Sequence, residues 1–101
     1  MKVVIERAGG GPVSFEDFAD RNGFTMKVRE RANCIGMAMQ FYASFDDVEV
    51  MDRGCLVGEY GNGHSPEAAI EDYKRCLVGK RLAFKASQPE RREVQCPTEW
   101  L

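Results

Sequence analysis

A glycine-rich turn in the second half of the chain contains the residues best suited to holding a small ligand. Gly61, Asn62, Gly63, His64 and Ser65 follow an apolar stretch and precede a helix-like pattern. Because backbone amides at a helix N-terminus can hold a phosphate or a carboxylate, this turn could form an anion or nucleotide site with His64 beside it. In the alternative interpretation it is a flexible connection whose glycines supply positive φ angles. The spacing matches neither the P-loop nor the dinucleotide fingerprint, and the P-loop lysine is missing.

Residues able to catalyse a reaction or to hold a metal ion are sparse. His64 is the only histidine, and a nucleophile working with it would have to lie close in space. One acidic group at a strand junction could hold Mg²⁺ or Ca²⁺, but it lacks the EF-hand pattern and is typical of a solvated turn. This group consists of Asp46, Asp47, Glu49 and Asp52. We therefore predict a protein that is not an enzyme, with no catalytic residue, no metal and no cofactor.

A basic stripe suits binding to a macromolecule. Lys27, Arg29 and Arg31 alternate along a predicted strand, so their side chains share one face. Such a face could meet RNA or an acidic protein, or it could simply be solvated.

The segment after this stripe, residues 34–39, is apolar and contains a glycine and two methionines. It could be a buried bulge or an extension of the strand. It could also be a partner-binding loop, because methionine suits adaptable interfaces. We predict that Ile35, Met37 and Met39 contact a partner together with the basic stripe.

Two helices are predicted from their capping residues. Ser65 is suited to an N-cap and Pro66 to the first helical position, which predicts the main helix over residues 65–78. Ser14 is suited to the same role before a short N-terminal helix over residues 15–22, and Gly23 suits its end.

Alternating apolar residues predict short strands between and beside these helices. Together they predict an α+β fold, with a small antiparallel sheet of about five or six strands and the main helix packed on one face. The predicted strands cover residues 2–6, 24–31, 40–45, 48–51, 55–60, 82–86 and 93–96.

Composition limits the function classes. The chain has 101 residues, of which 44% are hydrophobic and 30% charged, and this is typical of a single globular domain spanning residues 1–101. The net charge of -2 disfavours a non-specific nucleic-acid binder, which normally has a clear basic excess. A local basic face remains compatible with this charge.

The cysteines and the N-terminus predict a location. Cys34, Cys55, Cys76 and Cys96 include no C-x-x-C pair, and the sequence after Met1 does not have the pattern of a signal peptide. No apolar run approaches transmembrane length. We therefore expect reduced thiols and a cytoplasmic location.

The second half of the chain carries a recognisable motif. The sequence reads GNGHSPEAAIEDY over residues 61–73, GKRL over residues 79–82 and REV over residues 92–94. With these stretches the chain resembles a group of small uncharacterised phage and prophage proteins that share a G-N-G-x-[S/T]-P-E-x-A-I-x-D-Y motif. The resemblance implies a phage context and a bacterial host cell, and it carries no catalytic residue over. A looser similarity is to the N-terminal domain of HicB-type antitoxins, which implies protein binding.

These observations predict a small non-enzymatic protein of phage type, monomeric or homodimeric, that binds and inhibits a host protein. A host-defence component such as a CRISPR effector is the expected target. Two alternatives remain open. One is a small-ligand or nucleotide-binding protein using residues 61–65, and the other is an RNA-binding module using the basic stripe.

Overall fold

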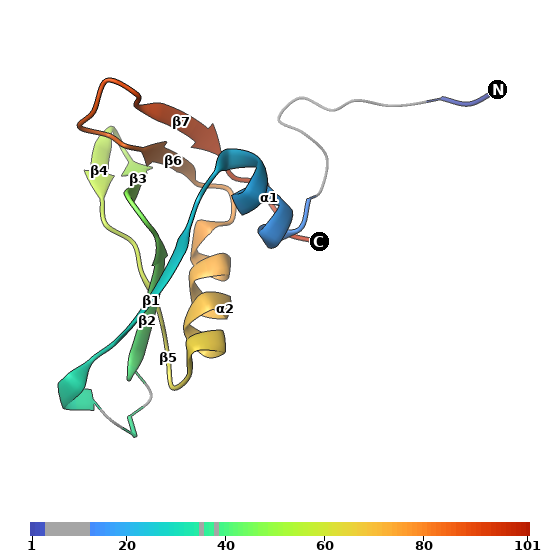
Figure 1. Cartoon of the computed structure of the whole chain (residues 1–101). Coiled ribbons are helices and arrows are strands. Elements are labelled where there is room, and N and C mark those ends of the chain that lie inside the picture. Colours follow the sequence, from blue (N-terminus) through green and yellow to red (C-terminus); the bar gives the residue numbers. More distant parts are fainter. Residues whose placement is uncertain (4–12, 35, 38) are drawn as a thin grey trace.

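The computed structural model describes residues 1–3, 13–34, 36–37 and 39–101 (Figure 1). Within these residues the chain has the predicted α+β fold, with two α-helices and a set of antiparallel strands. Helix α1 spans Phe15–Asn22 and helix α2 spans Pro66–Leu77, which confirms both predicted helices. The capping residues explain why they begin there, since Ser14 Oγ accepts a hydrogen bond from Asp17 N and Ser65 Oγ accepts one from Ala68 N, each at 3.1 Å.

The strands form two sheets, where the sequence predicted one. A three-stranded sheet has the order β1-β2-β5 and a four-stranded sheet has the order β4-β3-β6-β7. All neighbouring strands within them are antiparallel. The strands are β1 Met26–Glu30, β2 Phe41–Phe45, β3 Val48–Asp52, β4 Cys55–Val57, β5 Gly61–Gly63, β6 Arg81–Phe84 and β7 Arg92–Gln95.

A bend in one long hairpin explains the two sheets. Residues 41–52 form one nearly continuous extended run, but the chain turns at Asp46 and at Asp47, whose φ is 58°. Strand β2 therefore pairs in one sheet and β3 in the other. On the returning side, residues 58–60 separate β4 from β5. Arg53 and Gly54, with φ angles of 51° and 81°, form the hairpin turn between β3 and β4.

One predicted strand lies mostly outside the described residues, and one observed strand was not predicted. The predicted strand over residues 2–6 falls mostly outside the described residues, and Lys2 and Val3 have no regular secondary structure. Strand β5 was predicted as part of a turn, yet Gly61 and Gly63 pair with Ala43 and Phe41 of β2.

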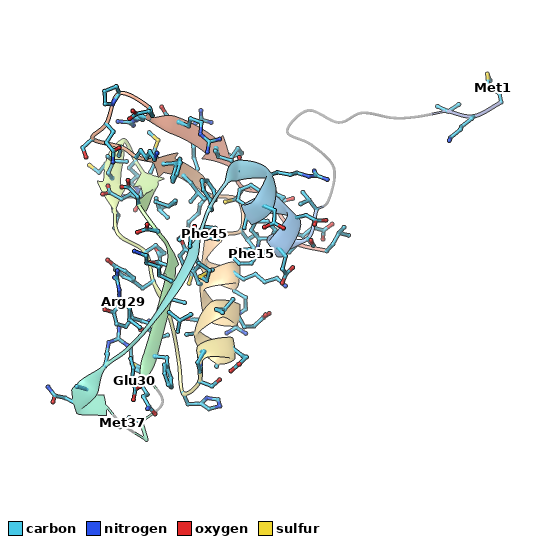
Figure 2. The ribbon with its side chains drawn as sticks, in the orientation of Figure 1. Met1, Phe15, Arg29, Glu30, Met37 and Phe45 are labelled. Atoms are coloured by element: carbon cyan, nitrogen blue, oxygen red, sulfur yellow. The ribbon has the colours of Figure 1, made fainter. Side chains whose placement is uncertain are left out.

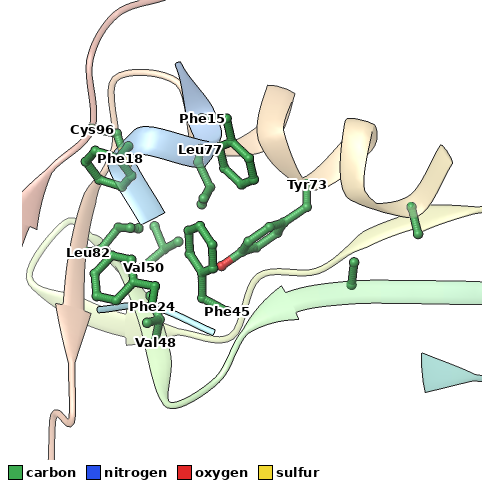
Figure 3. Close-up of a cluster of buried hydrophobic side chains, with 12 residues drawn as sticks. Phe15, Phe18, Phe24, Phe45, Val48, Val50, Tyr73, Leu77, Leu82 and Cys96 are labelled. Atoms are coloured by element: carbon green, nitrogen blue, oxygen red, sulfur yellow. The ribbon is translucent and has the colours of Figure 1, made fainter. Parts of the chain in front are cut away.

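Aromatic side chains fill the core between the helices and the two sheets (Figure 3). The ring of Phe45 lies 5.2 Å from that of Phe15, 5.0 Å from that of Phe24 and 5.3 Å from that of Tyr73. Trp100 packs edge-on against Phe15 and donates a hydrogen bond from Nε1 to the carbonyl of Lys74 at 2.8 Å. The C-terminal end of the described chain is thus tied to both helices.

Candidate functional site

Among the described residues, one face of the three-stranded sheet is covered by neither helix. Both helices lie on the other side of this sheet (Figure 1), and α2 packs against β5 and β2 there. The register places Lys27 opposite Ser44 and Arg29 opposite Tyr42. Because directly opposed residues of antiparallel strands share a face, these four side chains project away from α2, as Figure 2 shows for Arg29. The structure therefore puts the basic stripe on the solvent side of the sheet.

Two tyrosines extend the stripe across the sheet. The Arg31 guanidinium lies 4.6 Å from the centre of the Tyr42 ring, and the Tyr42 ring lies 5.6 Å from that of Tyr60 in an edge-to-face arrangement. Tyr60 is 47% exposed. We call the set formed by Lys27, Arg29, Arg31, Tyr42 and Tyr60 the outer face.

The loop between β1 and β2 continues the outer face at one end. Its 3-10 turn spans Ala32–Cys34, and Met37 and Met39 are 59% and 53% exposed. Arg31 joins the loop to the outer face by donating a 2.7 Å hydrogen bond from its guanidinium to the Met39 carbonyl. The predicted contact residue Ile35 lies outside the described residues.

Gln40 holds this loop in place. Its Nε2 donates to Glu30 Oε1 at 2.9 Å, its Oε1 accepts from the Gly36 amide at 3.0 Å, and its backbone amide donates to the Met37 carbonyl at 3.1 Å. The two methionines are therefore presented by a hydrogen-bonded loop, and neither belongs to the buried core.

The other end of the outer face is a hollow with charges of both signs. It has a volume of about 200 Å³ and lies beside the bend of the long hairpin. Lys27 pairs with Asp46 at 3.1 Å, and Asp47, Glu49 and Glu59 also line the hollow. The outer face is thus a positive and aromatic strip with an acidic border.

The glycine-rich turn has a structural explanation. A Cβ on Gly61 would lie 2.2 Å from the Ala69 carbonyl oxygen and from the Tyr73 amide, and one on Gly63 would lie 2.5 Å from the Ala69 amide. Glycine is required here because β5 runs against the backbone of α2. Neither glycine has the positive φ angle that the alternative interpretation assumed.

The other residues of this turn occupy separate environments. The backbone N–H of Asn62 donates to Asp72 Oδ2 at 2.8 Å. The side-chain Oδ1 of Asn62 is buried without a hydrogen-bond partner among the described residues. His64 is exposed and Ser65 caps α2. The site predicted from residues 61–65 therefore consists of two glycines under the helix, a cap and an exposed histidine, and its ligand stays a prediction.

The thiols of Cys76 and Cys96 are not activated as nucleophiles. Burial raises the pKa of the Cys96 thiol to about 12. The pKa of Cys76 is also raised, first by burial and then by the nearby carboxylates of Asp72 and Glu59. Both side chains are protonated at neutral pH, whereas a reactive cysteine needs a lowered pKa. Cys55, which is exposed, forms no disulfide with either of them.

Two further features are absent from the described part of the chain. No three histidine, cysteine, aspartate or glutamate side chains gather there in a way that could hold a metal ion. None of its helices is long and apolar enough to cross a membrane.

Comparison of the chain with protein-family models, with curated proteins and with solved structures gave no match. The resemblances to phage proteins and to HicB-type antitoxins therefore stay predictions.

Proposed function

We propose that this chain is a non-catalytic protein-binding module, and that the outer face, with Met37 and Met39 at its end, docks on an acidic surface of the partner. The observation that carries this proposal is the row formed by Arg31, Tyr42 and Tyr60 on a sheet face that neither helix covers. Arginine, tyrosine and methionine are enriched in protein interfaces, where a few such residues supply most of the binding energy.

The charge distribution favours a protein partner over a nucleic acid. The outer face has three basic side chains, and one of them, Lys27, is already paired with Asp46. Sequence-independent nucleic-acid binding rests on roughly 6–10 phosphate contacts in strong binders. Carboxylates at the border of the face would repel further phosphates, whereas a protein surface of mixed charge can match them.

The proposed setting follows from the resemblance to phage and prophage proteins. It makes a bacterial cytoplasmic protein, such as a CRISPR effector, the first partner to test, with inhibition as the expected consequence of docking.

Affinity capture from a nuclease-treated bacterial lysate tests the proposal. The wild-type chain is compared with Arg29→Glu on the outer face and with Arg53→Glu at the β3–β4 turn, a matched charge reversal away from it. We expect one stoichiometric protein with the wild type and with Arg53→Glu, and its loss with Arg29→Glu. Equal recovery by all three chains would remove the outer face from the binding site.

A second candidate function is binding of single-stranded RNA. The observation that favours it is the exposed ring of Tyr60 beside the Tyr42–Arg31 stack, because bases stack on aromatic rings and on guanidinium groups. A gel shift that weakens steeply with salt and disappears in Tyr60→Ala would replace the protein-binding proposal with this one.

A further inference from the structure

Strand β1 is an edge of the three-stranded sheet, and its hydrogen-bonding pattern shows which groups face outward. The Arg31 amide donates to the Gln40 carbonyl at 2.7 Å, and the Asp46 amide donates to the Thr25 carbonyl at 2.8 Å. In an antiparallel pair the bonded residues alternate, so odd-numbered residues of this strand bond to β2. The backbone N–H and C=O groups of Met26, Val28 and Glu30 therefore point away from the sheet.

This edge has no strand partner within the described part of the chain. Strand β1 pairs only with β2, and no loop or cap from another described residue bonds to the backbone of residues 26, 28 or 30. An edge of this kind is a template for pairing with a further strand.

The two sides of the edge differ in chemistry. On the outer face, Lys27 and Arg29 stand beside it, and Arg29 has no ion-pair partner among the described residues. On the inner side, Met26 and Val28 are half-buried and pack against the core. Met26 also lines an apolar groove of about 310 Å³ between α1 and α2, with Ala19 and Ile70 among its other walls.

We propose that the partner protein completes this edge with an extended strand in which acidic and apolar residues alternate. The inference rests on the proposed function, since it specifies how the partner of the outer face docks. Alternate side chains of an added strand point to opposite faces. The acidic ones would meet Lys27 and Arg29, and the apolar ones would cover Met26 and enter the groove.

Charge favours an acidic partner strand over a second copy of this chain and over the chain's own N-terminal residues. A second copy pairing through its own β1 would bring Lys27 and Arg29 of the two chains close together, and like charges across a strand pair are destabilising. The chain's own residues 2–7 read KVVIER, which carries more basic than acidic residues. Lys27 and Arg29 therefore disfavour a basic strand at this edge and favour an acidic one.

Amide hydrogen exchange on the ¹⁵N-labelled full chain tests the proposal. The probe is a short capped peptide of alternating glutamate and valine, and the control is the matching peptide of lysine and valine. At a glutamate-peptide concentration of about ten times its Kd, exchange at Met26, Val28 and Glu30 is expected to slow about tenfold. The amides of Lys27 and Arg29, which already bond to β2, should change less. The Arg29→Glu chain should shift its preference toward the lysine peptide.

Four results would overturn the inference. The first is no binding of the glutamate peptide, and the second is equal binding of both peptides by the wild type. The third is protection of the amides of residues 26, 28 and 30 in the chain without peptide. If this protection disappears on deletion of residues 1–7, the edge is filled by the chain itself, and if it disappears on dilution, the edge is filled by a second copy. The fourth is peptide-induced shifts at Tyr42 and Tyr60 without slower exchange at the edge, which would leave the proposed function standing. The proposed function is tested separately, by the sensitivity of partner capture to Arg29→Glu.

Discussion

Arg31 stacks its guanidinium on the Tyr42 ring at 4.6 Å and donates a hydrogen bond to the Met39 carbonyl. This one side chain therefore connects the open face of the sheet to the loop that presents the methionines. A surface whose side chains are already held in place loses less conformational entropy on binding than a set of free side chains. The arrangement is the physical basis for treating the outer face and the loop as one docking surface.

Tyr60→Ala should weaken partner binding by roughly tenfold or more, because an exposed tyrosine at the centre of an interface is a typical hot spot. Tyr60 is 47% exposed, so the stability of the folded chain should change little. Calorimetric titration with the captured partner measures the loss. Tyr60→Phe is the matched control and should retain most of the affinity. An unchanged affinity in Tyr60→Ala would place the interface elsewhere.

Met37→Asp should reduce binding without unfolding the chain. Met37 is 59% exposed, so a carboxylate there remains solvated in the free protein. In the complex it would face an acidic partner and would have to be desolvated. Surface plasmon resonance of Met37→Asp and of the neutral variant Met37→Gln separates charge from size. If both bind like the wild type, the loop is not part of the docking surface.

Gly61→Ala should destabilise the fold by about 3 kcal/mol or more, because the added methyl group meets the α2 backbone and forces strand and helix apart. Its Cβ would lie 2.2 Å from the Tyr73 amide. Gly58→Ala is the matched control, since a Cβ there lies no closer than 3.5 Å to the Tyr60 ring, and it should be nearly neutral. Urea unfolding monitored by circular dichroism measures both. Equal stability of the two variants would contradict the close packing of β5 on α2.

Alkaline pH should destabilise the protein through Tyr73. Burial raises the pKa of Tyr73 to about 12, above its ordinary value of 10. A raised pKa in the folded state means that the folded chain holds the Tyr73 proton more tightly than the unfolded chain does. The contribution of this proton to folding stability is therefore complete below pH 10 and is lost as the pH rises toward 12. Burial likewise raises the pKa of Cys96 from 9 to about 12.

The variant Tyr73→Phe isolates the tyrosine contribution. Above pH 10 the unfolding free energy of the wild type should decrease with pH. In Tyr73→Phe this decrease should be less steep, by an amount that corresponds to the release of up to about one proton on unfolding. Urea unfolding at several alkaline pH values gives this slope. An identical pH dependence in both chains would show that Tyr73 titrates equally in the folded and unfolded states.

The sequence predicted the helices and most strands because their signals are local. Ser14 and Ser65 cap the helices where their types and positions indicate, and alternation identified the strand that carries the basic stripe. The second sheet was missed because it depends on a bend at Asp47, a residue type that is compatible with several turns. Strand β5 was missed because Gly61 and Gly63 are poor strand formers, and only contact with α2 makes them necessary.

The basic part of the outer face was predictable for the same reason, since Lys27 and Arg29 alternate within β1 and Arg31 follows at the next alternate position. The tyrosines were not identified as its neighbours. Tyr42 and Tyr60 are separated from the stripe in sequence, and their place beside it depends on the pairing register of β1 with β2 and on the path of residues 58–60. An outward position for Tyr42, between the inward Phe41 and Ala43, was the available signal.

The most direct test of the outer face is the affinity of the purified, captured partner for Arg29→Glu compared with Arg53→Glu, measured by isothermal titration calorimetry at one salt concentration. Both substitutions change the net charge equally, so long-range electrostatic effects are matched. The proposed docking surface predicts that Arg29→Glu weakens binding by about tenfold or more while Arg53→Glu stays close to wild type. Equal affinities for the two variants would contradict it.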